Sequence, residues 1–171
     1  MRTTHCLLAA LTFAAAGIHA SENKAGASVD SQAAFARLKS LAGEWEASTS
    51  SGKAHLSYEV IAGGTSIVER DTAEKMPGML TVYHMDGARL MLEHYCMAGN
   101  QPRMEARAYD PQTGELRFEF AGAANLASKD AGHMHNVTFR LTGSERLDSK
   151  WEFYEGDKLK FAENFEYTRV K

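Results

Sequence analysis

The sequence predicts an all-β protein: an antiparallel up-and-down barrel of about ten strands, preceded by a short N-terminal helix. Three observations carry this prediction. Hydrophobic and polar residues alternate from Gly43 to the C-terminus, which is the period of a β-strand. Glycine-containing turn signals divide this part of the chain into short segments. Almost no helix is left to cover a sheet, so closure is favoured, because an open ten-stranded sheet would expose two edges.

The helix is predicted from a change of period just before the strands. Asp30 or Ser31 can cap its N-terminus, and Phe35, Leu38 and Leu41 fall three residues apart on one face. Gly43 ends this pattern. We therefore expect about three helical turns with one apolar face.

The predicted strands follow one another with tight turns between them. Only residues 121–132 form a long connection. The strands are expected to begin near Glu44, Ala54, Thr65, Met79, Ala88, Gln101, Glu115, His133, Ser149 and Leu159.

The first 20 residues have the features of a secretory signal peptide. Arg2 supplies the positive start, a short apolar run follows, and residues 18–20 form an acceptable cleavage site. The run is too short to cross a bilayer, which takes roughly 20 apolar residues. We predict a signal peptide over residues 1–20, a disordered leader over 21–29 and one barrel domain over 30–171. The protein is expected to be exported, to the periplasm or beyond, without a transmembrane segment.

Composition and charge exclude some partners. The chain has 171 residues, 44% of them hydrophobic, which suits one globular domain. The signal peptide holds one of the 19 basic residues and none of the 22 acidic ones, so the mature net charge is −4. A mildly acidic chain without basic clusters lacks the electrostatic footprint of a nucleic-acid-binding protein. No nucleophile elbow, phosphate-binding glycine loop or zinc-protease helix is present either.

Cysteine usage leaves one thiol in the mature protein. Cys6 is lost with the signal peptide, so Cys96 has no intramolecular disulfide partner. In an oxidising compartment this thiol must be buried, bound, reactive or paired between chains. Burial as a small hydrophobe is the interpretation we favour.

Polar residues on apolar strand faces mark candidate sites, because one face of each barrel strand points inward. His94 alternates in step with Leu90, Leu92 and Cys96 and is expected inside. Glu163 falls among the aromatic residues of the last strand, where a carboxylate needs a partner or a raised pKa.

Two further histidines form a His-x-His pair. His133 and His135 are expected on the face of Val137 and Phe139, and alternate strand residues lie about 7 Å apart, so both imidazoles could bind one ion. A third ligand would have to come from elsewhere. The alternative is that His133 lies at the barrel rim and His135 makes a hydrogen bond in the core.

A turn after the strand of His94 concentrates hydrogen-bonding groups. Asn100, Gln101 and Arg103 can donate to a carboxylate or phosphate, and Tyr95 adds a hydroxyl. The alternative is a hairpin in which Asn100 takes the turn position and Arg103 is solvated.

Several motifs resemble those of a family of exported bacterial lipocalin-like, calycin-type barrels of unknown function, over about residues 36–170. These motifs are Leu38-x-x-Leu41-x-Gly43-x-Trp45, Val82-Tyr83-His84-Met85-Asp86-Gly87, His94-Tyr95-Cys96, Gly99-Asn100-Gln101-Pro102-Arg103-Met104, His133-Met134-His135 and Trp151-Glu152-Phe153-Tyr154. The resemblance implies the barrel fold and a periplasmic location. It assigns no substrate, cofactor or catalytic residue.

These observations support a first hypothesis of a periplasmic protein that binds a small, partly apolar ligand within the barrel. His94, Tyr95, Asn100, Gln101, Arg103 and Glu163 are the expected ligand-binding residues. A second hypothesis is a metal-dependent protein or enzyme, in which His133 and His135 join His94 or Glu163 around a divalent ion. A haem-binding barrel with an axial histidine is a third. A fully packed barrel that acts through its outer surface is the fourth.

Overall fold

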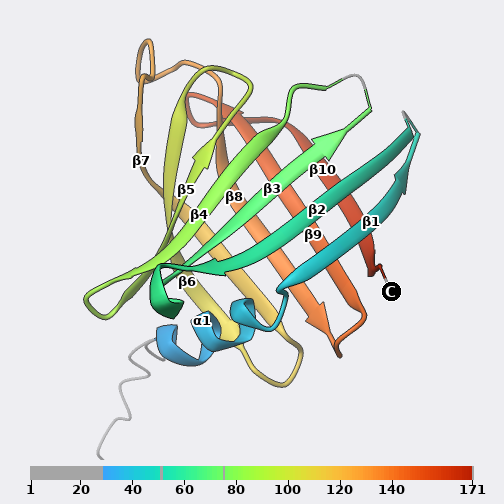
Figure 1. The fold of residues 1–171 in the computed structure, drawn as a ribbon. Coiled ribbons are helices and arrows are strands. Elements are labelled where there is room, and N and C mark those ends of the chain that lie inside the picture. Colours follow the sequence, from blue (N-terminus) through green and yellow to red (C-terminus); the bar gives the residue numbers. More distant parts are fainter. Residues whose placement is uncertain (1–28, 51, 75, 171) are drawn as a thin grey trace, which may run out of the picture.

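The computed structural model describes residues 29–50, 52–74 and 76–170, and in it each strand pairs with the next one along the chain. The first strand also pairs with the last, so the described residues form a closed, ten-stranded antiparallel barrel (Figure 1). The predicted fold class is thereby confirmed. The elements are α1 (Ser31–Lys39), β1 (Gly43–Thr49), β2 (Gly52–Ile61), a 3₁₀ turn (Ala62–Gly64), β3 (Ser66–Ala73), β4 (Met79–Asp86), β5 (Arg89–Tyr95), β6 (Gln101–Asp110), β7 (Glu115–Ala124), β8 (His133–Thr142), β9 (Arg146–Glu155) and β10 (Lys158–Arg169). The predicted signal peptide and nearly all of the predicted leader lie outside the described residues.

Turn glycines set the strand boundaries. Gly114, between β6 and β7, has a φ of +72°, and a Cβ at this position would overlap the carbonyl group of Leu141. Glycine is therefore required here by both conformation and space. Most strands begin within two residues of the predicted positions, whereas β9 begins at Arg146 rather than near Ser149.

Helix α1 covers one end of the barrel, where it packs against β4, β5 and β6 (Figure 1). The carboxylate of Asp30 caps the helix by accepting a hydrogen bond of 2.9 Å from the backbone N–H of Ala33. Phe35, Leu38 and Leu41 are buried, as the spacing predicts. We call the covered end the closed end and the opposite end, formed by the β1–β2, β3–β4, β5–β6, β7–β8 and β9–β10 turns, the mouth.

Trp45 and Arg169 hold the closed end together. The indole Nε1–H of Trp45 donates to the carbonyl oxygen of Leu41 at 2.8 Å. The guanidinium of Arg169 lies 4.2 Å from the centroid of the Trp45 ring and donates to the carbonyl oxygens of Ser40 and Ala42 at 2.9 and 2.8 Å. The last strand is thereby tied to the chain between α1 and β1.

We expect Arg169→Met to lower the free energy of unfolding by about 2 kcal/mol, because it removes the cation–π contact and charge-assisted hydrogen bonds while keeping an unbranched apolar stem. Urea unfolding at neutral pH measures this change. The exposed Arg146 provides the control, since Arg146→Met should change stability by less than about 0.5 kcal/mol. Equal effects of the two substitutions would show that the contacts of Arg169 with Trp45, Ser40 and Ala42 do not stabilise the closed end.

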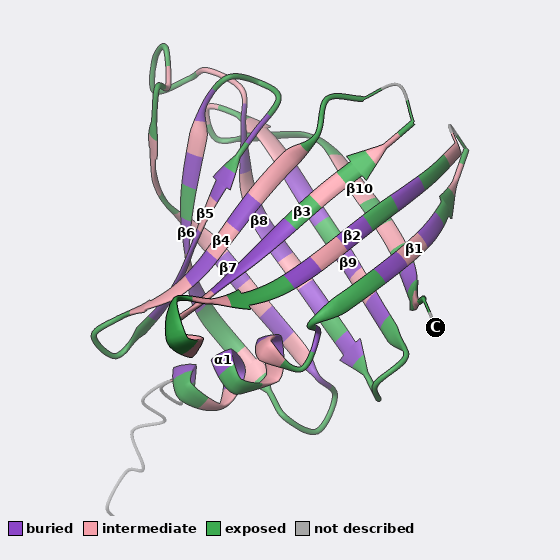
Figure 2. Ribbon diagram, in the orientation of Figure 1, coloured by how far each residue is buried: buried purple, intermediate pink, exposed green. Residues whose placement is uncertain are grey.

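The closed half of the barrel is filled by side chains. Tyr83, Phe118 and Phe139 are fully buried and contact one another with ring centroids 6.0 to 6.3 Å apart. Buried and exposed residues alternate along the strands in Figure 2. No helix in the described residues is long and apolar enough to cross a membrane. Because side chains fill the closed half, the space inside the barrel that could take a ligand lies toward the mouth.

Candidate functional site

A row of polar side chains crosses the barrel wall from β2 to β5. Register places Tyr58 opposite Glu69, Glu69 opposite Thr81, and Thr81 opposite His94. All four are at most 4% exposed. We call these residues the polar row.

Hydrogen bonds connect most of the polar row. The phenol of Tyr83, two residues along β4 from Thr81, donates to Glu69 Oε2 at 2.6 Å. The Thr81 hydroxyl lies 3.5 Å from Glu69 Oε1 and 2.9 Å from His94 Nδ1, so it bridges the carboxylate and the imidazole. His94 Nε2 is buried and has no hydrogen-bond partner among the described residues.

Burial shifts the pKa values of Glu69 and His94 in opposite directions. Burial raises the pKa of Glu69 to about 7, although hydrogen bonds from Tyr58 and Tyr83 oppose the shift. Burial also lowers the pKa of His94 to about 4. At neutral pH the imidazole is therefore uncharged, packed against the Trp151 ring with centroids 4.8 Å apart. The Glu69 carboxyl group can hold or release a proton near neutral pH.

A cavity of about 410 Å³ opens at the mouth, between β1, β3 and β10. Two carboxylates face it, Asp71 on β3 and Glu163 on β10. The remaining lining is polar or apolar without charge: Ser48, Thr49, Ser50, Ala73, Met76, Pro77, Met79, Asn164 and Phe165. We call this space the mouth cavity.

Both carboxylates of the mouth cavity are shifted toward the protonated form. Burial, followed by the charge of Glu163, raises the pKa of Asp71 to about 6. Burial raises the pKa of Glu163. No lysine, arginine or histidine lines the cavity among the described residues, so the site attracts hydrogen-bond donors and cations.

The predicted ligand-binding residues do not form one cluster. Glu163 faces the mouth cavity, and His94 lies inside the barrel, opposite Thr81 and two residue pairs deeper than Met79. Tyr95 is 46% exposed, because it alternates with His94 and points outward. Arg103 is exposed and pairs in register with Glu93 on the outer wall.

The other two predicted ligand-binding residues lie at the rim and hold loops. Asn100 is buried, and its amide donates to the carbonyl oxygen of Gly132 at 2.8 Å. Gln101 accepts a hydrogen bond of 2.6 Å from the amide of Asn125. Both side chains therefore connect the β5–β6 turn to the β7–β8 connection.

His133 and His135 do not share the inward face of Val137, and that expectation was wrong. A register shift between Met134 and Asn136 places Met134 in the core instead. His133 Nε2 lies 2.9 Å from His135 Nδ1, and His133 Nδ1 lies 2.8 Å from the carbonyl oxygen of Ala131.

This histidine pair is built into an aromatic stack. Phe120 contacts both rings, with centroids 4.5 and 4.8 Å away, and Tyr154 stacks on His135 at 4.5 Å. A divalent ion held by both imidazoles would have to replace the hydrogen bond between them. No group of three or more His, Cys, Asp or Glu side chains in the described part of the chain is placed to hold a metal ion. Divalent metal or haem binding stays a prediction that elemental analysis and haem titration test.

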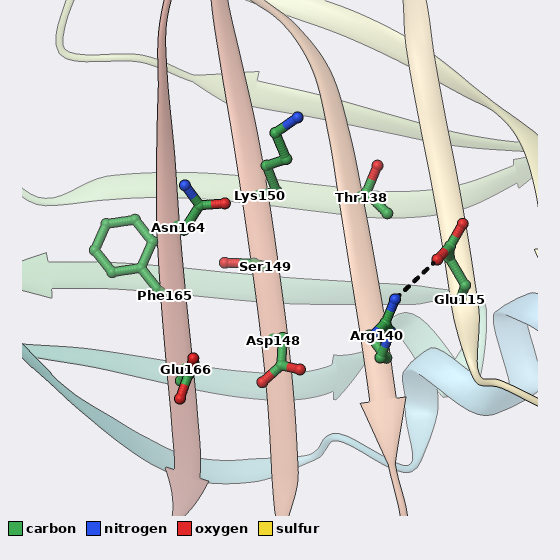
Figure 3. A pocket seen from close by; sticks show the side chains of 9 residues that line it. All are labelled: Glu115, Thr138, Arg140, Asp148, Ser149, Lys150, Asn164, Phe165 and Glu166. Carbon is green, nitrogen blue, oxygen red and sulfur yellow. Dashed lines mark hydrogen bonds and ion pairs between the residues drawn. The ribbon is translucent and has the colours of Figure 1, made fainter.

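A groove of about 350 Å³ lies along the outer wall formed by β7 to β10 (Figure 3). Both signs of charge occur in it: Arg140 pairs with Glu115 at 3.4 Å, and Lys150 and Asp148 both line the groove from β9. Such mixed polar side chains are typical of the solvated face of a barrel strand. We therefore place the candidate site at the mouth.

Sequence reasoning missed Asp71 and Glu69, which are central to the inner surface. Both lie on β3, where Ile67 and Val68 are consecutive apolar residues and hide the inward face. The only signal was the i, i+2 spacing of the two acids.

The fold defines a class: a closed ten-stranded antiparallel barrel compatible with a calycin-like fold and with the binding of a small molecule. Sequence comparison adds no closer assignment, since no protein-family model and no curated protein matches the chain.

Proposed function

We propose that this protein is exported to the periplasm and binds a small, partly apolar molecule with an amino group in the mouth cavity. The observation that carries the proposal is the pair of carboxylates, Asp71 and Glu163, in a cavity whose described lining contains no basic side chain. A cationic amine would offset the cost of burying these charges. Phe165 and Met79 would contact the apolar part.

Three probes of similar shape test this proposal: 2-phenylethylamine, 2-phenylethanol and 3-phenylpropionate. We expect calorimetric titration at neutral pH to show binding in the order amine, alcohol, carboxylate, because only the amine forms ion pairs with Asp71 and Glu163. The double variant Asp71→Asn and Glu163→Gln should weaken amine binding by about tenfold or more. Glu166→Gln is the matched control, since Glu166 lies on β10 but is exposed on the outer wall.

Amine binding that the double variant leaves unchanged would contradict the proposal, as would tighter binding of the carboxylate. Native mass spectrometry of protein from the exporting host adds a separate readout. We expect it to show a retained organic molecule.

A further inference from the structure

Sulfur-containing side chains converge on a second, smaller cavity at the mouth. Seven methionines lie within the described residues, and four of them line this space of about 210 Å³ together with the only cysteine there. We call it the sulfur pocket. Its lining consists of Met76, Met79, Cys96, Met97, Ala98, Met134, Phe153, Phe161 and Glu163.

The four methionines reach the sulfur pocket from different parts of the chain. Met79 begins β4, Met134 belongs to β8, Met97 follows β5, and Met76 precedes β4. These four methionines are far apart in the sequence, and only the closed barrel brings them together. A methionine that only fills space in a hydrophobic core is buried, whereas Met76 is 39% exposed and Met97 is 53% exposed.

The sulfur-containing residues of the pocket differ in how far they are buried. Cys96 and Met134 are buried at 9% and 7% exposure, and the two exposed methionines lie nearer solvent. Glu163 adds the only ionisable oxygen ligand in the described lining, and no basic residue lines the space. Thiolate and thioether sulfur are the ligands that select Cu(I) over harder cations.

We propose that the sulfur pocket binds one Cu(I) ion through the Cys96 thiolate and methionine thioethers, with the Glu163 carboxylate adding negative charge nearby. On binding, the Cys96 S–H bond breaks, the proton leaves to solvent and a sulfur–copper bond forms, so no electron is transferred. Unbranched methionine side chains can move to complete the coordination. This inference goes beyond the amine-binding proposal and does not depend on it.

Methionine methyl signals provide the test. We would label the purified protein with ¹³C-methyl methionine and titrate it anaerobically with Cu(I) supplied as its acetonitrile complex. The signals of Met76, Met79, Met97 and Met134 should shift and saturate near one equivalent. Those of Met85, Met91 and Met104, which lie outside the pocket lining, should not shift.

Variants then locate the ligands. Competition with bicinchoninate should show that Cys96→Ser weakens Cu(I) binding by about tenfold or more, because a hydroxyl is a poor ligand for a soft ion. Met91→Leu is the matched control and should leave the affinity unchanged. If Cys96→Ser fails to fold by circular dichroism, the double variant Met79→Leu and Met134→Leu replaces it, since these swaps conserve volume.

Three outcomes would overturn the copper proposal: no methyl shift at one equivalent, equal shifts of all seven methionines, or an affinity that neither variant set changes. We expect Asp71→Asn to weaken amine binding and to leave the Cu(I) affinity unchanged, because Asp71 does not line the sulfur pocket. The two proposals can therefore fail separately.

Discussion

The protein should lose about 3 kcal/mol of unfolding free energy between pH 4.5 and pH 8 through Glu69 alone, and Glu69→Gln should remove this loss. Burial raises the pKa of Glu69 from 4.5 to about 7, so the folded protein binds this proton more tightly than the unfolded chain. The stabilisation is complete below the unfolded pKa and disappears as pH rises through the folded value. Urea unfolding of both proteins across this pH range measures the difference.

Two variants show whether this pH dependence belongs to Glu69. Glu166 is exposed, so Glu166→Gln should reproduce the wild-type profile. Asp71→Asn should remove a separate component at lower pH, because the pKa of Asp71 is raised only to about 6. Parallel wild-type and Glu69→Gln profiles would show that Glu69 titrates normally in the folded protein.

Trp45→Ala should lower the free energy of unfolding by about 3 to 5 kcal/mol, the range for emptying a buried aromatic site. Trp45 is 1% exposed, and its removal also leaves Arg169 without the ring beneath its guanidinium. Thermal and urea unfolding followed by far-UV circular dichroism measure the loss. Trp45→Phe provides the comparison, because it keeps an aromatic ring and should cost less than half as much.

An effect of Trp45→Ala below about 1 kcal/mol would mean that the closed end can repack without the indole. In that case Arg169→Met should also have little effect, because both residues stabilise the same junction. The two measurements therefore test the same junction, one through Trp45 and the other through Arg169.

The sequence predicts the barrel well because its signals are local. Period-two alternation and turn glycines mark most strand ends directly, and the order of hairpins then leaves closure as the way to cover both edges. The helix is equally readable, since Asp30 caps it and the spacing of Phe35, Leu38 and Leu41 gives its buried face.

The site was less predictable because it depends on which face of each strand turns inward. His94 was placed correctly, since its strand alternates without interruption. His133 and His135 were not, because one extra residue in β8 reverses the alternation and leaves no mark in the sequence. Asp71 and Glu163 face the same cavity only because the barrel closes, which brings β3 and β10 to that cavity.

The seam between β1 and β10 is short. Its register comprises two residue pairs in the described chain, Trp45 with Arg169 and Glu46 with Thr168, both near the closed end. Farther along, Ser48 of β1 and Phe165 of β10 line the mouth cavity. The two strands can therefore separate toward the mouth without breaking either pair of this register, while the aromatic interior keeps its packing.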